Sequence, residues 1–163
     1  MPAQEDDYIL RQIEILGEIV AQLLKRRDPV GEEYALLQAF ALQEKLFGMP
    51  AATFLKLSSV DQVAALAKNE PEATGRGKCL SYVMLLRDTA SLYQLRGQGD
   101  FAFGARKLAL NIALLTANGQ PTDPATALVR ELQGILAGAP LDAPIQALLD
   151  HFNDVLRKMA LSD

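Results

Sequence analysis

Apolar residues recur along this chain at the three- and four-residue intervals that mark one face of a helix. The first such segment runs from about Asp6 to Arg27, and its apolar positions step alternately by four and three residues: Ile9, Ile13, Leu16, Val20 and Leu23. Acidic residues stand at its start and basic residues at its end, as the helix dipole favours. The pattern predicts a long amphipathic helix.

The next segments carry their own start and stop signals. Asp28-Pro29 provides a cap and a first-turn proline for a second helix, in which Ala35, Ala39, Leu42 and Leu46 share a stripe. Gly48-Met49-Pro50 stops it. One or two helical turns are expected in the stretch that follows, and Ser59 with Gln62 has the spacing of a capping box for a small helix over residues 60 to 68.

The second half of the chain is expected to be helical over residues 78 to 96 and 101 to 117. Two further helices begin at Asp123-Pro124 and at Asp142. Alternating or β-branched runs typical of strands are missing. The sequence therefore predicts an all-α fold of about six or seven helices.

The chain has the length of one domain. Its 163 residues, half of them hydrophobic and 22% charged, are enough to bury a core without disulfides or metals. We expect a single all-helical domain over residues 1–163. The polar, breaker-rich segment "NEPEATGRG" gives a possible internal boundary in a loop at residues 69–77.

Charge and cysteine content restrict the partners and the location. The formal net charge is −4 and the sequence pI is near 5.0, so we expect no nucleic-acid binding, which needs a basic patch. There is one cysteine, and we find neither a secretory signal pattern nor an apolar run long enough to span a membrane. These features favour a cytoplasmic protein that does not bind membranes.

Two glycine-rich stretches imitate phosphate-binding loops. Gly97, Gly99 and Ala102 match the dinucleotide fingerprint, but the residues before them have helical character, whereas the fingerprint needs a preceding strand. "TGRGKCLS" resembles the end of a P-loop, yet Glu72 and Cys79 replace the first glycine and the hydroxyl residue. We interpret the first stretch as a turn between helices, which Gly97 or Gly99 closes in the left-handed conformation and after which Asp100 caps the next helix.

No catalytic constellation emerges from the remaining polar residues. His151 is the single histidine, and a surface ion pair with Asp154 is its simplest interpretation. Cys79 lies near a predicted helix start, where a thiolate would be favoured, although a lone helical cysteine is usually a small buried apolar residue. Acidic pairs such as Glu32-Glu33 fall at predicted helix starts, where the helix dipole favours negative charge. We therefore expect no enzymatic activity, no cofactor and no metal.

The hairpin expected over residues 82 to 118 carries a family resemblance. Ala90, Tyr93, the glycines, Phe101, the small pair Gly104-Ala105 and Leu108 resemble the tetratricopeptide-repeat pattern over one repeat. The chain is also similar to small bacterial proteins classed as tetratricopeptide-like, a family without an established activity. The resemblance implies antiparallel helical hairpins stacked in a right-handed array, in which small residues allow close helix packing, and a groove for a peptide.

These observations favour a protein-protein interaction or scaffold domain. Its partner would be another protein or peptide, or a second copy in a homodimer, for which the stripe Ile9, Ile13, Leu16, Val20 and Leu23 is the candidate self-association face. The same stripe also fits an ordinary buried helix. The alternative function is a small-molecule-binding helical bundle or a metal-free enzyme, with candidate groove residues Tyr82, Arg87 and Tyr93 and, for the enzyme, Asp88.

Overall fold

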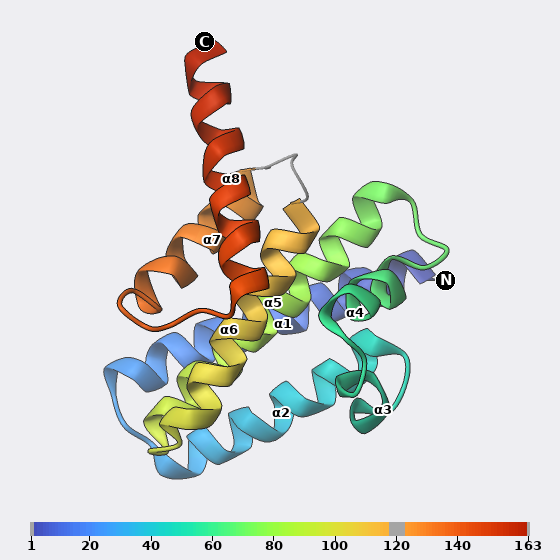
Figure 1. Cartoon of the computed structure of the whole chain (residues 1–163). Coiled ribbons are helices and arrows are strands. Elements are labelled where there is room, and N and C mark those ends of the chain that lie inside the picture. Colours follow the sequence, from blue (N-terminus) through green and yellow to red (C-terminus); the bar gives the residue numbers. More distant parts are fainter. Residues whose placement is uncertain (1, 118–122, 163) are drawn as a thin grey trace.

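The computed structural model is helical throughout the ranges it describes, residues 2–117 and 123–162 (Figure 1). These ranges hold eight helices and no strand: α1 (Pro2–Lys25), α2 (Pro29–Phe47), α3 (Ala51–Leu55), α4 (Ser59–Ala67), α5 (Glu72–Leu95), α6 (Gly99–Ala117), α7 (Asp123–Ile135) and α8 (Ala143–Ser162). The predicted all-α class is confirmed. The number of helices exceeds six or seven because the short turns after Pro50 form the separate helix α3.

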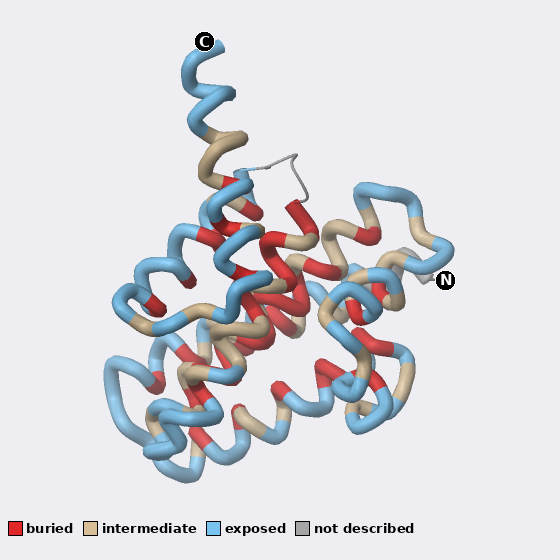
Figure 2. The backbone as a smooth tube through the Cα atoms, in the orientation of Figure 1, coloured by how far each residue is buried: buried red, intermediate tan, exposed pale blue. Residues whose placement is uncertain are grey.

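Helix α5 lies at the centre of the molecule. It contacts α1, α2, α4, α6 and α7, and it pairs most extensively with α6. The buried parts of the backbone gather along α5 and α6, while the outer sides of the other helices are exposed (Figure 2). A helix covered from several sides must be apolar over much of its circumference, which explains why the sequence of α6 lacks a single polar face.

Helix ends follow the expected chemistry at the two hairpins. The Asp28 carboxylate accepts a hydrogen bond from the Gly31 amide, and Pro29 occupies the first turn of α2. Gly48 closes α2 with φ 67°, and Gly97 follows α5 with φ 75°, so both adopt the left-handed conformation that glycine allows. The Gln98 amide donates to the Tyr93 carbonyl at 2.8 Å. The glycine-rich stretch is thus a turn between helices.

Three local predictions are wrong. Ser58, not Ser59, caps α4, because its hydroxyl accepts from the Asp61 amide at 3.2 Å. Asp100 lies inside the first turn of α6 instead of preceding it. Residues 72–77 of the expected polar loop form the first turns of α5, where Gly75 packs against Ala67 of α4. The absence of a side chain at Gly75 therefore serves helix packing.

An aromatic cluster joins α2, α3 and α5. The rings of Phe47 and Phe54 stack with centroids 3.7 Å apart, and Tyr82 meets both edge-on. The Tyr82 hydroxyl donates to Gln62 Oε1 at 3.1 Å, so the one polar atom of this buried ring is satisfied. Gln62 Nε2 in turn donates to the Leu57 carbonyl. These bonds attach α4 to the cluster.

The small residue Gly104 does not mediate close helix packing. A Cβ atom placed on Gly104 would meet no atom within 4 Å, and the residue is exposed on α6. A Cβ atom on Gly75 would instead lie 3.0 Å from the Ala67 Cβ and 3.2 Å from its Cα. Of these two glycines, Gly75 at the contact between α4 and α5 is therefore the one that allows close helix packing.

This difference makes a matched pair of substitutions informative. Gly104→Ala should raise the free energy of unfolding by about 0.5–1 kcal/mol, because alanine favours the helix interior and meets open space. Gly75→Ala should lower it by about 1–3 kcal/mol through overpacking against Ala67. Chemical denaturation of both variants tests whether Gly75, and not Gly104, lies at a close helix contact. Equal effects of the two substitutions on the free energy of unfolding would contradict this difference between the two glycines.

Candidate functional site

The three candidate groove residues lie in separate surroundings. Tyr82 is fully buried in the aromatic cluster. Arg87 forms an ion pair with Glu131 of α7 at 3.2 Å, on another side of α5. Tyr93 is partly buried between Phe40 of α2 and Phe101 of α6. They do not line one groove, because Arg87 faces α7, while Tyr82 and Tyr93 are separated along α5 and contact different rings of α2.

The proposed self-association stripe of α1 lies inside the fold. Ile13, Leu16, Val20 and Leu23 are buried within the chain, and Ile9 is partly buried against the core. Helix α1 packs on α2 and α5. The stripe is therefore the core-facing side of an ordinary buried helix, which was the second interpretation of the pattern.

An apolar face is left exposed on α2 instead. Val30, Tyr34 and Leu37 are 80%, 64% and 61% exposed, and Ala41 continues the row at the same helical spacing. We call these four residues the outward face of α2. The opposite side of the helix is buried against α1 and α5. Helix α2 runs along the edge of the molecule in Figure 1.

Aromatic rings extend this apolar surface. Phe40, on the α5 side of the outward face, lies 6.5 Å from Tyr93 between ring centroids, and Tyr93 lies 5.4 Å from Phe101. Phe101 is largely exposed at the start of α6. The three rings thus continue the surface across α5 to α6. Large exposed apolar surfaces are typical of interaction sites, whereas single exposed apolar residues need no explanation.

An ion pair between the exposed Arg27 and the buried Glu32 holds the start of α2. Glu32 is 1% exposed, and both of its oxygens accept hydrogen bonds from Arg27, at 3.0 and 3.2 Å. Bonding to Arg27 lowers the pKa of Glu32, and the Asp28 amide adds a further bond. Arg27 also donates to the Leu95 carbonyl at the end of α5. The start of α2 is thereby attached to both α1 and α5.

Acidic side chains accompany the outward face. Glu33 and Glu44 are both exposed, and helical spacing places them on the side of the face that also carries Phe40. On the other side Lys45 lies over the Tyr8 ring, with its nitrogen 6.0 Å from the centroid. An apolar surface with two neighbouring carboxylates can accept an amphipathic helix that carries basic groups.

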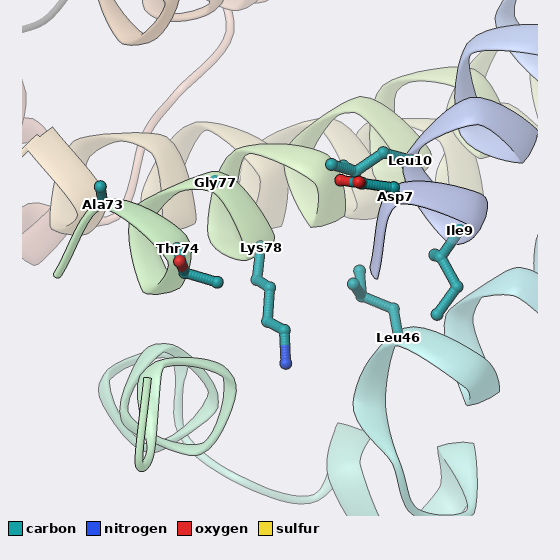
Figure 3. Close-up of a pocket in the computed structure, with 8 residues that line it drawn as sticks. All are labelled: Asp7, Ile9, Leu10, Leu46, Ala73, Thr74, Gly77 and Lys78. Atoms are coloured by element: carbon teal, nitrogen blue, oxygen red, sulfur yellow. The ribbon is translucent and has the colours of Figure 1, made fainter. Parts of the chain in front are cut away.

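A pocket lies between the ends of α1, α2 and α5 (Figure 3). Its volume is about 340 Å³, and its lining is mostly apolar: Asp7, Ile9, Leu10, Leu46, Ala73, Thr74, Gly77 and Lys78. Its one basic group is already engaged, since Lys78 Nζ donates to Glu70 Oε1 at 2.8 Å. The pocket can hold a small, mostly apolar molecule, and Asp7 is the second charged residue of its lining.

Asp88 is a buried carboxylate with incomplete hydrogen bonding. It is 5% exposed, its Oδ2 has no hydrogen-bond partner, and the backbone of Gly17 on α1 approaches that oxygen. Its Oδ1 lies 3.5 Å from Arg87 Nε. Burial raises the pKa of Asp88 to about 6, against the opposing effect of Arg87. The cost of burying this charge therefore lowers the stability of the folded state.

The other chemically reactive residues do not form a site. Cys79 is buried in the third turn of α5, away from the helix start, and burial raises the pKa of its thiol. His151 is exposed on α8, while Asp154 pairs with Lys158. Within residues 2–117 and 123–162, no cluster of three histidine, cysteine, aspartate or glutamate side chains is placed to hold a metal ion.

Comparison with models of protein families gives no match, and neither curated proteins nor solved structures match the chain. In the part of the chain that the structure describes, none of the helices combines the length and apolar character needed to cross a bilayer.

The buried carboxylate leads to a pH-dependent prediction. With a folded-state pKa of about 6 against an ordinary 3.8, the folded protein binds the proton more tightly, so stability falls as pH rises through this window. Asp88→Asn removes the buried charge. At pH values well above the folded-state pKa it should raise the free energy of unfolding by up to about 3 kcal/mol, and the gain should vanish in acid.

Denaturant titrations over a series of pH values measure this difference. Glu14→Gln, which neutralises an exposed carboxylate of α1, is the matched control and should change the free energy by less than about 0.5 kcal/mol. A pH-independent loss of stability in Asp88→Asn would show that the carboxylate is needed as an anion.

Proposed function

We propose that this chain is a non-enzymatic protein-protein interaction domain, and that the outward face of α2 is its docking surface. One observation carries the proposal: α2 is apolar on both sides, although one side is exposed. A surface helix in a monomeric protein is normally polar on its exposed side. Exposed apolar residues at helical spacing, continued by Phe40, Tyr93 and Phe101, favour a helix of a partner as the occupant.

The proposal includes a tetratricopeptide-like relation between the hairpins. The antiparallel pairs α1–α2 and α5–α6 support it, because α1 and α2 both pack on α5, as consecutive hairpins of such an array would. The helices α3 and α4 interrupt the succession of hairpins. The outward face of α2 would then lie on an outer surface of the stack.

The alternative, a small-molecule-binding bundle or a metal-free enzyme, has weaker support. The pocket in Figure 3 has the volume of a small ligand site, but its basic side chain bonds Glu70. Tyr82, Arg87 and Tyr93 also face different neighbours. The lining of this pocket is mostly apolar, with Asp7, Thr74 and Lys78 as its polar members, so it offers few groups to orient a substrate.

Site-specific crosslinking tests the docking surface. A photoreactive amino acid is placed at Leu37 and, as a matched control, at Val60 of α4, since both side chains are 61% exposed. In cells that naturally make the protein, position 37 should give one discrete adduct, and position 60 should give none. Tyr34→Glu, which adds a charge to the outward face, should reduce the adduct at least tenfold.

The adduct supports the proposal whether it contains a second copy or another protein. Equal, diffuse crosslinking from positions 37 and 60 would overturn it. Because Leu37, Val60 and Tyr34 are all exposed, the substitutions leave the core intact. Circular dichroism of each purified variant confirms that the helices remain folded.

A further inference from the structure

A groove runs between α1 and α2 on the exposed side of this hairpin. The two helices are antiparallel (Figure 1), and both pack on α5 with their buried sides. Two hollows of about 280 and 680 Å³ lie between them, and Ile19 lines both. They therefore form one continuous groove, from Tyr8 and Lys45 at one end to Arg26 and Gly31 at the other, which we call the α1–α2 groove.

The middle of the α1–α2 groove is apolar and joins the outward face of α2. On the α1 side Ile15 is 41% exposed and Ile19 is partly buried. On the α2 side the groove is lined by Tyr34 and Ala41, which both belong to the outward face. A partner that docks on the outward face can therefore fill the groove as well.

Each end of the groove carries a cation that has no ion-pair partner among the described residues. Arg26 lines one end, and Lys45 lines the other, where it lies over the Tyr8 ring. The other two charged residues of the lining, Arg27 and Asp28, are already engaged, one in the ion pair with α2 and one in the helix cap. The groove thus offers a positive charge at each end of an apolar middle.

Charge disfavours a second copy of the chain as the occupant. If the grooves of two copies faced each other, a two-fold axis would set Arg26 against either Arg26 or Lys45, so cations would oppose cations in both arrangements. Arg11 and Glu18, which helical spacing places beside the groove on α1, carry opposite charges and leave this balance unchanged. The complementary occupant therefore carries carboxylates.

The dimensions and surroundings of the groove specify the partner further. Residues 8–26 of α1 span about 27 Å at 1.5 Å per residue, the length of about five helical turns. A third helix can pack along two antiparallel helices by fitting its ridges between theirs. Glu33 and Glu44 border the outward face on the side away from the groove, so basic side chains fit the other edge of such a helix.

We infer that the α1–α2 groove binds a helix of a different protein, one that has an apolar stripe and an acidic side chain near each end of that stripe. This inference rests on the proposed docking role of the outward face and names the chemistry of its partner. The apolar stripe covers Ile15, Ile19 and Tyr34, and the two carboxylates meet Arg26 and Lys45.

Three synthetic helical peptides test this chemistry. They share one leucine stripe of about five turns, to match the groove, and differ only at one position near each end of the stripe, which holds glutamate, glutamine or lysine. Fluorescence anisotropy measures their binding to the purified full chain. The glutamate peptide should bind roughly tenfold more tightly than the lysine peptide, with the glutamine peptide between them, and salt should reduce the difference.

Charge reversal in the protein should reverse this order. In the double variant Arg26→Glu with Lys45→Glu, the lysine peptide should bind more tightly than the glutamate peptide. The matched control is Lys68→Glu with Arg130→Glu, which changes the net charge equally at exposed residues after α4 and on α7. This control should keep the original order of the three peptides.

A second pair of variants tests whether the peptides occupy the groove itself. Ile15→Glu places a charge in its apolar middle and should weaken the binding of all three peptides roughly tenfold. Leu24→Glu is the matched control, because Leu24 is 55% exposed on the other side of α1, and it should leave binding unchanged. Circular dichroism of each variant confirms that the helices remain folded.

Three peptide results overturn the inference: equal affinity for the three peptides, a preference for the lysine peptide, or no binding of any of them. A crosslinked adduct from position 37 that contains a second copy of the chain overturns it as well. In each case the proposed function still stands if position 37 gives one discrete adduct, and it fails if position 37 gives none.

Discussion

The covering of α5 from several sides is the constraint on which the rest of the structure depends. Its neighbours approach closely because the residues at each contact fit: Gly75 against Ala67, and Tyr82 among the rings of Phe47 and Phe54. Polar groups that enter this core are mostly bonded, as Gln62 shows by bonding to Tyr82. The exception is Asp88, whose burial beside Gly17 opposes the folded state at neutral pH. Close packing of α5 therefore outweighs the cost of one poorly solvated carboxylate.

The all-α fold class and several helix ends could be predicted from the sequence, because the features that determine them are local. Apolar periodicity, Asp28 with Pro29, and the glycines at positions 48 and 97 act within a few residues of the chain. The start of α5 was predicted too late, because glycine and polar residues at positions 72–77 normally indicate a loop. Packing of Gly75 on α4 reverses that local preference, and the sequence near residue 75 carries no sign of this contact.

The candidate site was less predictable, because exposure depends on which elements cover each face. The stripes of α1 and α2 are both apolar, and periodicity alone cannot say which one remains outside. The available signal was the presence of Val30, Tyr34 and Leu37 on the side of α2 opposite its predicted stripe. Glu32 shows the same limit: its place near a helix start suggested a dipole effect, whereas its side chain is buried and forms an ion pair with Arg27.

Hydrogen bonds hold α2 rigidly, and this rigidity favours binding at its exposed face. The bonds from Arg27 to Glu32 and to the Leu95 carbonyl hold the start of α2 on α1 and α5, and Gln43 contacts Thr89 further along. A surface held in this way loses little conformational entropy when a helix docks on it.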